Sequence, residues 1–474
     1  MKTTIKSLIA SLTLIFSSCS GFLDVKPSVG LPTDDAFETI KDAEVALNGI
    51  YTQLQHYVWY GSYMALYGDI KGDDMQCTTD GARLETQYRF QETANSNLIP
   101  QELWNKPYSA IRQANNLLYQ LEGKTLSGAT EVQTNDIRGK ALALRGLALF
   151  DLTRLFGRPY TLDNGESPGV PVVTEAVKPD YQPGRQSVRE CYEQIIRDFE
   201  EAITLMSDEK KPGEINKYGA MALLSRVYLY QGNWKLALHY AEEVIQNSDY
   251  RLWNRDEYSS VWGKEGTSEV IFEIVMTQTN NIGTEAPGYL LSKEGYNAVI
   301  LTEAFTKLIQ SDPDDIRNLI IKSESAEGKP FDNQKVYLLK YPGKEGMNVT
   351  INNINVIRLS EVYLNAAEAA FKTGDSEKAL TYLNAIATRA NPAAVTTDIS
   401  LERILNERRK ELAGEGHRFF DAVRNGINIE RSGGWHLILN PESQIIKTDD
   451  HKIVLPIPQS EFNANANMTQ NPGY

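Results

Sequence analysis

Two stretches of the chain combine flat aromatic side chains with carboxylates, amides and a guanidinium, and neither stretch shows helical periodicity. An aromatic ring can bury the C–H face of a sugar, while Asp, Asn and Arg side chains hydrogen-bond the hydroxyl rim. The alternative is simple packing, since most Trp and Tyr side chains are largely buried. The residues predicted to bind a flat, hydroxylated ligand are Trp59, Tyr60, Asp73, Asp74, Arg83, Tyr289 and Tyr296.

Catalytic and metal-binding patterns are weak by comparison. The five histidines have no HExxH or similar spacing, so we expect no metal site of that kind and no cofactor. The acidic run 312–315 could hold calcium but lacks the Gly and distal Glu of an EF-hand loop, so a helix boundary is the favoured interpretation. Arg418, Asp421 and Arg424 share a helix face, and we interpret the charged cluster 407–424 as structural. The chain is therefore not predicted to be an enzyme.

The N-terminus has the order of a secretory signal. Lys2 and Lys6 precede a short apolar run that ends at Phe16, and two serines then lead to Cys19. The run is too short to span a bilayer, which needs roughly 20 residues. The sequence 16–19 resembles a bacterial lipobox, which predicts cleavage of residues 1–18 and lipidation of Cys19. The alternative is an ordinary signal peptide with an incidental cysteine.

Composition is that of an acidic globular protein. The 474 residues carry a net charge of -14, which becomes -16 without Lys2 and Lys6. This balance argues against nucleic acid as a partner. Hydrophobic residues make up 41% of the chain, enough for one large domain or two intertwined parts, about 19–215 and 216–474.

Cys77 and Cys191 could form one disulfide at most, and the sequence leaves their pairing open.

Helical periodicity dominates the rest of the chain. Apolar stripes predict helices near 42–54, 104–121, 141–155 and 188–205, the first capped by Asp42. Residues 220–244 have tetratricopeptide spacing, with Gly232 at the turn and Tyr228 and Trp234 in the core, and a second match turns at Gly374. Because these glycines lie 142 residues apart, we expect scattered repeats. Strands are predicted at 270–275 and 336–341, and irregular segments at 57–93, 276–299 and 426–450.

Short motifs occur in order at 22–27, 46–51, 104–115, 145–157, 358–369, 407–424, 455–458 and 471–474. Together these motifs resemble the SusD/RagB family of Bacteroidota outer-membrane lipoproteins. They follow Cys19 and extend to the last residue, so the resemblance covers essentially the whole mature chain. Surface export in these bacteria often accompanies acidic residues directly after the lipidated cysteine, and here four residues intervene before Asp24.

The resemblance implies a mostly α-helical fold, with tetratricopeptide-like helix pairs on one side and irregular loops with a few short strands on the other. It also implies a lipid-anchored protein of the cell outer membrane that faces the extracellular side. Such a protein binds oligosaccharides or polysaccharides and delivers them to a SusC-like TonB-dependent transporter. Peptide or other nutrient capture by the same architecture is one alternative. A tetratricopeptide scaffold that binds only protein partners is another.

Overall fold

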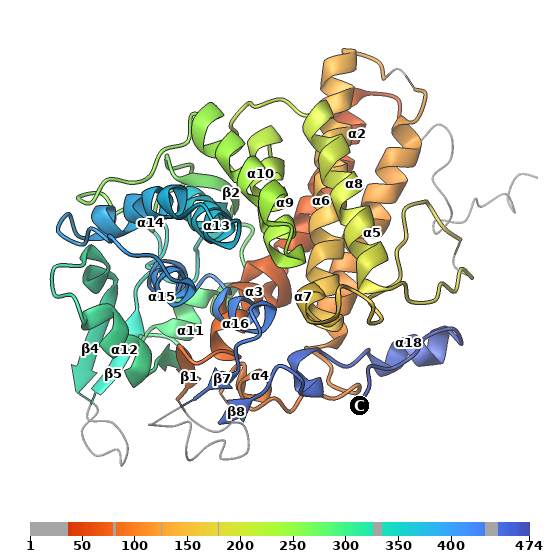
Figure 1. Ribbon diagram of the computed structural model, residues 1–474. Coiled ribbons are helices and arrows are strands. Elements are labelled where there is room, and N and C mark those ends of the chain that lie inside the picture. The colour runs from red at the N-terminus through yellow and green to blue at the C-terminus, as the bar shows by residue number, and fades with distance from the viewer. Residues whose placement is uncertain (1–36, 79–81, 125, 179, 326–333, 432–443) are drawn as a thin grey trace, which may run out of the picture.

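Long helices packed side by side form most of the protein (Figure 1). The computed structural model describes residues 37–78, 82–124, 126–178, 180–325, 334–431 and 444–474. Neighbouring helices pack in the order α2, α5, α6, α8, α9, α10, α13, α14 and α15. Their bounds are α2 Ile40–Leu54, α5 Gln101–Leu121, α6 Glu131–Phe156, α8 Val188–Leu205, α9 Lys217–Gln231, α10 Trp234–Asn247, α13 Leu359–Lys372, α14 Ser376–Ala390 and α15 Leu401–Leu412.

Local sequence signals fix where several of these helices begin. Helix α8 has the bounds that its apolar stripe predicted, and Ser187 with Glu190 forms a capping box at its start. In α2 the N-cap is Thr39, whereas Asp42 was predicted to cap the helix. Asp42 is the other half of the box, and its carboxylate accepts the Thr39 backbone N–H at 2.9 Å.

The two predicted tetratricopeptide-like pairs are α9 with α10 and α13 with α14. Gly232 and Gly374 take left-handed conformations at the two turns, with φ of 81° and 85°. Helix α10 packs directly against α13, so the pairs are neighbours in space and the expectation of scattered repeats is wrong. The intervening chain leaves the helical stack and returns to it.

Trp234 also differs from the prediction that it belongs to the core. It is half-buried at the first position of α10, and the Lys372 ammonium lies 5.3 Å from its ring centroid. Tyr228, from the same repeat, is buried as predicted. The N-terminal end of α10 therefore presents its indole partly to solvent.

Strands are short and form two-stranded antiparallel sheets in the described parts of the chain. The two predicted strands are present as β2 and β5. The pairs are β1 (Met75–Cys77) with β3 (Val299–Leu301), β2 (Val270–Ile274) with β6 (Ile354–Arg358), β4 (Ile321–Ser325) with β5 (Gln334–Leu338), and β7 (Ile429–Glu430) with β8 (Ile445–Ile446).

The segment predicted to be irregular at 57–93 is largely ordered and buried. Helix α3 is buried at every position, so its sequence lacks the polar face from which an amphipathic helix is recognised. Small elements also occur in the other connecting segments. These short elements are η1 (Tyr57–Gly61, a π-helical turn), α3 (Tyr63–Ile70), α4 (Glu85–Tyr88), α7 (Tyr160–Asp163), η2 (Gly283–Glu285), α11 (Pro287–Leu291), α12 (Glu303–Gln310), η3 (Ile316–Ile320), α16 (Arg418–Arg424), η5 (His451–Ile453) and α18 (Gln459–Ala464).

A buried network of ion pairs joins the C-terminal elements. Arg358, 0% exposed, contacts carboxylates of Glu269, Glu411 and Glu415 at 2.6, 2.7 and 2.8 Å. Removing one partner from such a network would leave an uncompensated buried charge. The structural interpretation of the charged cluster at 407–424 is confirmed, since Arg424 in this cluster likewise pairs with buried acids.

A second buried contact set stabilises the helical stack. The Arg145 guanidinium donates to Asp198 on α8 and, at 2.8 Å, to the Asn115 side-chain oxygen on α5. Asn115 and Arg145 thus serve a structural role between the helices of the stack. Cys77 and Cys191 are both buried and free, so they do not pair.

Candidate functional site

Pairing of β1 with β3 brings together two of the segments that carry predicted binding residues. Met75 pairs with Leu301 and Cys77 with Val299. The pairing continues one residue further, where the Thr78 N–H donates to the Ala298 carbonyl at 3.1 Å. The chain that leaves β1 and the chain that enters β3 therefore emerge at the same edge of this small sheet.

Arg83, from the first of these segments, contacts two residues of the second. Its guanidinium lies 5.1 Å from the ring centroid of Tyr296, within cation–π range. Its Nε donates to Glu285 Oε1 at 3.0 Å. Arg83 and Tyr296 are each 45% exposed, Arg83 by its side chain, so this arrangement lies at the surface. The predicted residues Arg83 and Tyr296 are thus brought together.

More tyrosines extend this group. The Tyr63 hydroxyl donates to Glu285 Oε2 at 2.9 Å, and the Tyr57 ring meets that of Tyr63 edge-on with 5.4 Å between centroids. Tyr289, a predicted site residue, meets Tyr296 edge-on at 5.0 Å. We call this group the aromatic cluster. It consists of Tyr57, Tyr63, Arg83, Glu285, Tyr289 and Tyr296.

Three members of the aromatic cluster were not predicted as site residues. Tyr57 and Tyr63 lie in the segment 57–93, close to Trp59 and Tyr60, which were predicted as ligand contacts. Glu285 carried no signal, because its role depends on the β1–β3 pairing. The loops are held in place by further bonds, such as the Thr78 hydroxyl donating to the Asn297 carbonyl at 2.5 Å.

The chemistry of the aromatic cluster is that of a shallow recognition surface. Burial, followed by the neighbouring Glu285 carboxylate, raises the pKa of Tyr63 far above its usual range, so this phenol stays protonated and donates. Glu285 offers acceptor oxygens and Arg83 offers donors beside the partly exposed ring of Tyr296. A ring with flanking charged hydrogen-bonding groups suits a hydroxylated ring-shaped ligand.

Trp59 and Tyr60 do not belong to this surface, and their prediction as ligand contacts is wrong. Trp59 is 0% exposed and its indole N–H donates to Asp151 Oδ2 at 2.7 Å. Tyr60 is 5% exposed, and burial raises the pKa of its phenol. Both side chains point into the helical core, because the π-helical turn η1 packs against α5 and α2.

Asp73 and Asp74 are likewise occupied by the protein itself, which contradicts their prediction as hydrogen-bonding groups for a ligand. The Arg418 guanidinium donates to Asp73, with Nη2 at 3.1 Å from Oδ2. Arg409 donates through Nε to Asp74 Oδ1 at 3.0 Å, and the Asp74 side chain is 0% exposed. These carboxylates connect the chain before β1 to α15 and α16.

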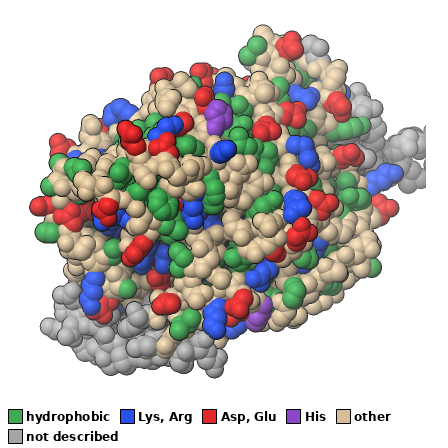
Figure 2. All heavy atoms as spheres, in the orientation of Figure 1, with side chains coloured by type: hydrophobic (Ala, Val, Ile, Leu, Met, Phe, Trp, Pro, Cys, Tyr) green, Lys and Arg blue, Asp and Glu red, His purple; other side chains and the backbone are tan. Residues whose placement is uncertain are grey.

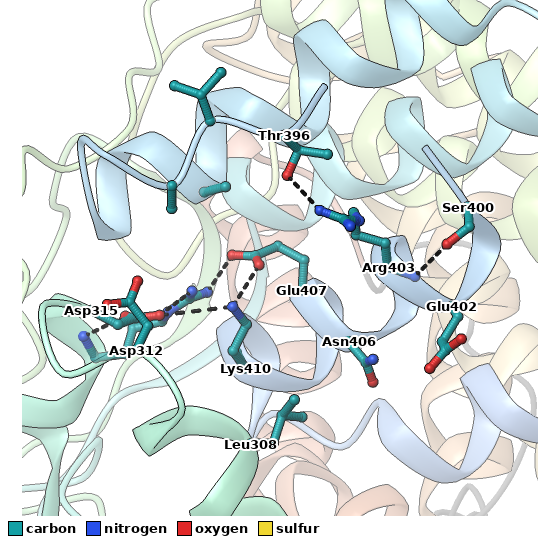
Figure 3. A pocket seen from close by; sticks show the side chains of 14 residues that line it. Leu308, Asp312, Asp315, Thr396, Ser400, Glu402, Arg403, Asn406, Glu407 and Lys410 are labelled. Carbon is teal, nitrogen blue, oxygen red and sulfur yellow. Dashed lines mark hydrogen bonds and ion pairs between the residues drawn. The ribbon is translucent and has the colours of Figure 1, made fainter. Parts of the chain in front are cut away.

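A charged cleft of about 470 Å³ lies between α12 and α15 (Figure 3). Several of its charged groups pair with one another. Lys410 contacts Glu407 at 2.8 Å, and Arg317 contacts Asp315 and Glu407 at 2.6 and 2.8 Å. Asp315 also caps η3, which confirms that the acidic run 312–315 marks a helix boundary. With several of these charges already paired and no aromatic side chain among its described lining residues, this cleft suits a sugar ring less well than the aromatic cluster does.

The described residues include no group of three or more His, Cys, Asp or Glu side chains suited to a metal ion. No helix within the same ranges is long and apolar enough to cross a membrane. Figure 2 shows basic and acidic side chains interspersed over the face in view. Cys19, predicted to carry the lipid, lies outside the described residues.

Comparison with known proteins places this architecture in a family. Residues 317–474 match the SusD family, and residues 21–229 match a family described as starch-binding associating with outer membrane. A SusD superfamily protein from Bacteroides thetaiotaomicron VPI-5482 is 42% identical, with a TM-score of 0.87, over 92% of this chain and 100% of that chain. The chain belongs to the SusD family.

Two further solved structures are similar. A SusD superfamily protein from Bacteroides vulgatus ATCC 8482 is 38% identical over 92% of this chain and 100% of that one, with a TM-score of 0.88. A protein described as a laminarin binding SusD-like protein is 25% identical over the same two shares, with a TM-score of 0.73. The mostly helical fold predicted from the sequence is therefore confirmed.

Proposed function

We propose that this protein is a cell-surface lipoprotein that binds oligosaccharides or polysaccharides through the aromatic cluster and performs no catalysis. The observation that carries the proposal is the placement of Arg83 and Glu285 around the partly exposed Tyr296 ring. Membership of a family with a starch-binding description supports a carbohydrate ligand, as does the similarity to a laminarin-binding protein.

Recognition would follow from the geometry of the aromatic cluster. A sugar face would pack on the exposed part of Tyr296, and neighbouring hydroxyls would bond Arg83 and Glu285. Tyr63 and Tyr289 hold Glu285 and Tyr296 in place through the contacts at 2.9 and 5.0 Å. Such a prearranged site loses little side-chain entropy when it binds.

Location and partner complete the proposal. A lipid on Cys19 would anchor the protein in the outer membrane, facing outward. Because the protein would only bind its ligand, it would deliver the ligand to a SusC-like TonB-dependent transporter, which would supply the energy for uptake. The test is crosslinking in cells, followed by purification in mild detergent. Recovery of a larger β-barrel protein is expected, and repeated recovery of the lipoprotein alone would contradict the pairing.

The ligand class is tested with a glycan array probed by the purified protein. Binding to at least one glycan is expected, and calorimetry on a Tyr296→Ala variant then tests the site. Tyr119→Ala is the matched control, because Tyr119 is 51% exposed and lies on α5 outside the aromatic cluster. No bound glycan together with capture of peptides from a peptide array would favour the alternative nutrient class.

A further inference from the structure

A second cleft, of about 620 Å³, lies along α5 and shares no residue with the aromatic cluster. One side is α5, and the other is formed by residues 171–178 and 180–183 together with α18, at the right of the molecule in Figure 1. Trp104 and Tyr108 of α5 line it, and Tyr181 lies on the facing segment. The volume falls within the range of about 300–1,000 Å³ that is typical of small-ligand sites.

The segment that forms the facing wall is fixed to α5 by side-chain hydrogen bonds to its backbone. The Tyr108 hydroxyl donates to the Pro171 carbonyl at 2.8 Å. The Asn115 amide donates to the carbonyls of Val173 and Glu175 at 2.9 and 3.0 Å. Because alternate carbonyls at residues 171, 173 and 175 are all bonded to α5, this part of the wall keeps its shape.

The far end of the same segment is tied to α18. The Asn465 amide donates to the Pro183 carbonyl at 2.8 Å, and the Gln182 amide donates to the Ala464 carbonyl at 3.0 Å. Both ends of the wall are therefore fixed to elements that pack on the core.

The side chains that face the cleft leave hydrogen-bonding capacity unused. Tyr181 is 51% exposed, and Arg112 is exposed with no ion pair among the residues that the structure describes. Glu461, half-buried on α18, brings a carboxylate that accepts a hydrogen bond from the Trp104 side chain and has further lone pairs to offer. Charges of both signs fit a neutral ligand with donors and acceptors better than an anion or a cation.

We propose that this cleft is a second binding site, for a short neutral saccharide of about two or three rings. The exposed ring of Tyr181 and the half-buried ring of Tyr108 would bury the apolar faces of the sugar. Arg112 on α5 and the remaining lone pairs of Glu461 on α18 would bond its hydroxyls. This cleft is separate from the aromatic cluster, so an experiment can contradict the second site without contradicting the proposed function, and the reverse.

The test uses the Tyr296→Ala protein, in which the aromatic cluster is impaired. A panel of neutral trisaccharides of glucose, mannose, galactose and xylose, including maltotriose and laminaritriose, is titrated by calorimetry. At least one should bind, and adding Tyr181→Ala or Arg112→Gln should weaken it at least about tenfold. Adding Tyr119→Ala, which changes an exposed tyrosine of α5 that does not line the cleft, should leave the affinity unchanged.

Three results would overturn the proposal. The first is no saturable binding of any trisaccharide to the Tyr296→Ala protein. The second is binding that Tyr181→Ala and Arg112→Gln both leave unchanged, with thermal melting showing that both variants are folded. The third is binding of proline-containing peptides that depends on Tyr181, with no trisaccharide bound, which would assign the cleft to a protein partner. The proposed role of the aromatic cluster is tested separately. It would be contradicted if the Tyr296→Ala protein bound an array-identified glycan with the wild-type affinity.

Discussion

The guanidinium of Arg83 lies over the ring of Tyr296, 5.1 Å from its centroid, although the two residues come from segments far apart in the sequence. Tyr289 meets the same ring edge-on, and Glu285 holds Arg83 through an ion pair at 3.0 Å. The orientation of Tyr296 is therefore fixed from two directions while 45% of the residue remains exposed. A fixed, partly exposed ring is what a stacking ligand needs.

Replacing Trp59 should affect stability and not ligand binding. Trp59→Ala leaves a cavity and removes the hydrogen bond to Asp151, so the free energy of unfolding should fall by about 3–5 kcal/mol. Trp59→Phe keeps most of the volume and should lose less. Chemical denaturation measures both, and calorimetry with an array glycan should give the wild-type affinity for Trp59→Phe. A loss of glycan binding by Trp59→Phe, with normal melting, would show that Trp59 takes part in ligand binding.

How far the sequence predicts the fold depends on how each segment is buried. Helix α8 has one apolar face, and its bounds were predicted correctly. Helix α3 is buried all round and was missed. The same burial explains the error at Trp59, since an aromatic in a segment without periodicity looks like a loop residue.

The candidate site was predictable only in part, for a different physical reason. Arg83, Tyr289 and Tyr296 were chosen for their residue types, and the structure brings them together at the surface. Their meeting depends on the pairing of β1 and β3, strands of three residues that carry too little pattern to reveal a register. Asp73 and Asp74 were indistinguishable by type from ligand-binding carboxylates until Arg409 and Arg418 were placed beside them.

The stability of the protein should depend on pH through His417. Burial lowers the pKa of this imidazole to about 4, against about 6.5 in the unfolded chain. Between these values the unfolded chain binds a proton that the folded chain does not. The free energy of unfolding should therefore fall by up to about 3 kcal/mol as the pH drops through this window.

The measurement is urea denaturation at pH 7, 6, 5 and 4. A His417→Gln variant serves as the comparison, because it cannot gain that proton. The difference between wild type and variant should shrink or reverse toward pH 4. Parallel pH curves for the two proteins would show that His417 is not responsible.

Lipidation is expected at Cys19, because a secretory signal ends there. Cells labelled with a palmitate analogue should incorporate label into the wild-type protein and not into Cys19→Ser, which should also leave the membrane fraction. Cys77→Ser and Cys191→Ser are controls at the two buried cysteines and should keep the label. Label retained on Cys19→Ser would rule out this anchor.

The most direct test of glycan binding at the aromatic cluster is calorimetric titration of an array-selected glycan into wild-type, Tyr296→Ala and Tyr119→Ala proteins, with thermal melting of all three. Losing the Tyr296 ring should cost about 1–3 kcal/mol of binding free energy, in the range for truncating an anchor residue. Melting should change little, because Tyr296 is 45% exposed. Tyr119→Ala should bind as the wild type does. Equal affinity for all three proteins would contradict the assignment of the aromatic cluster as the glycan site.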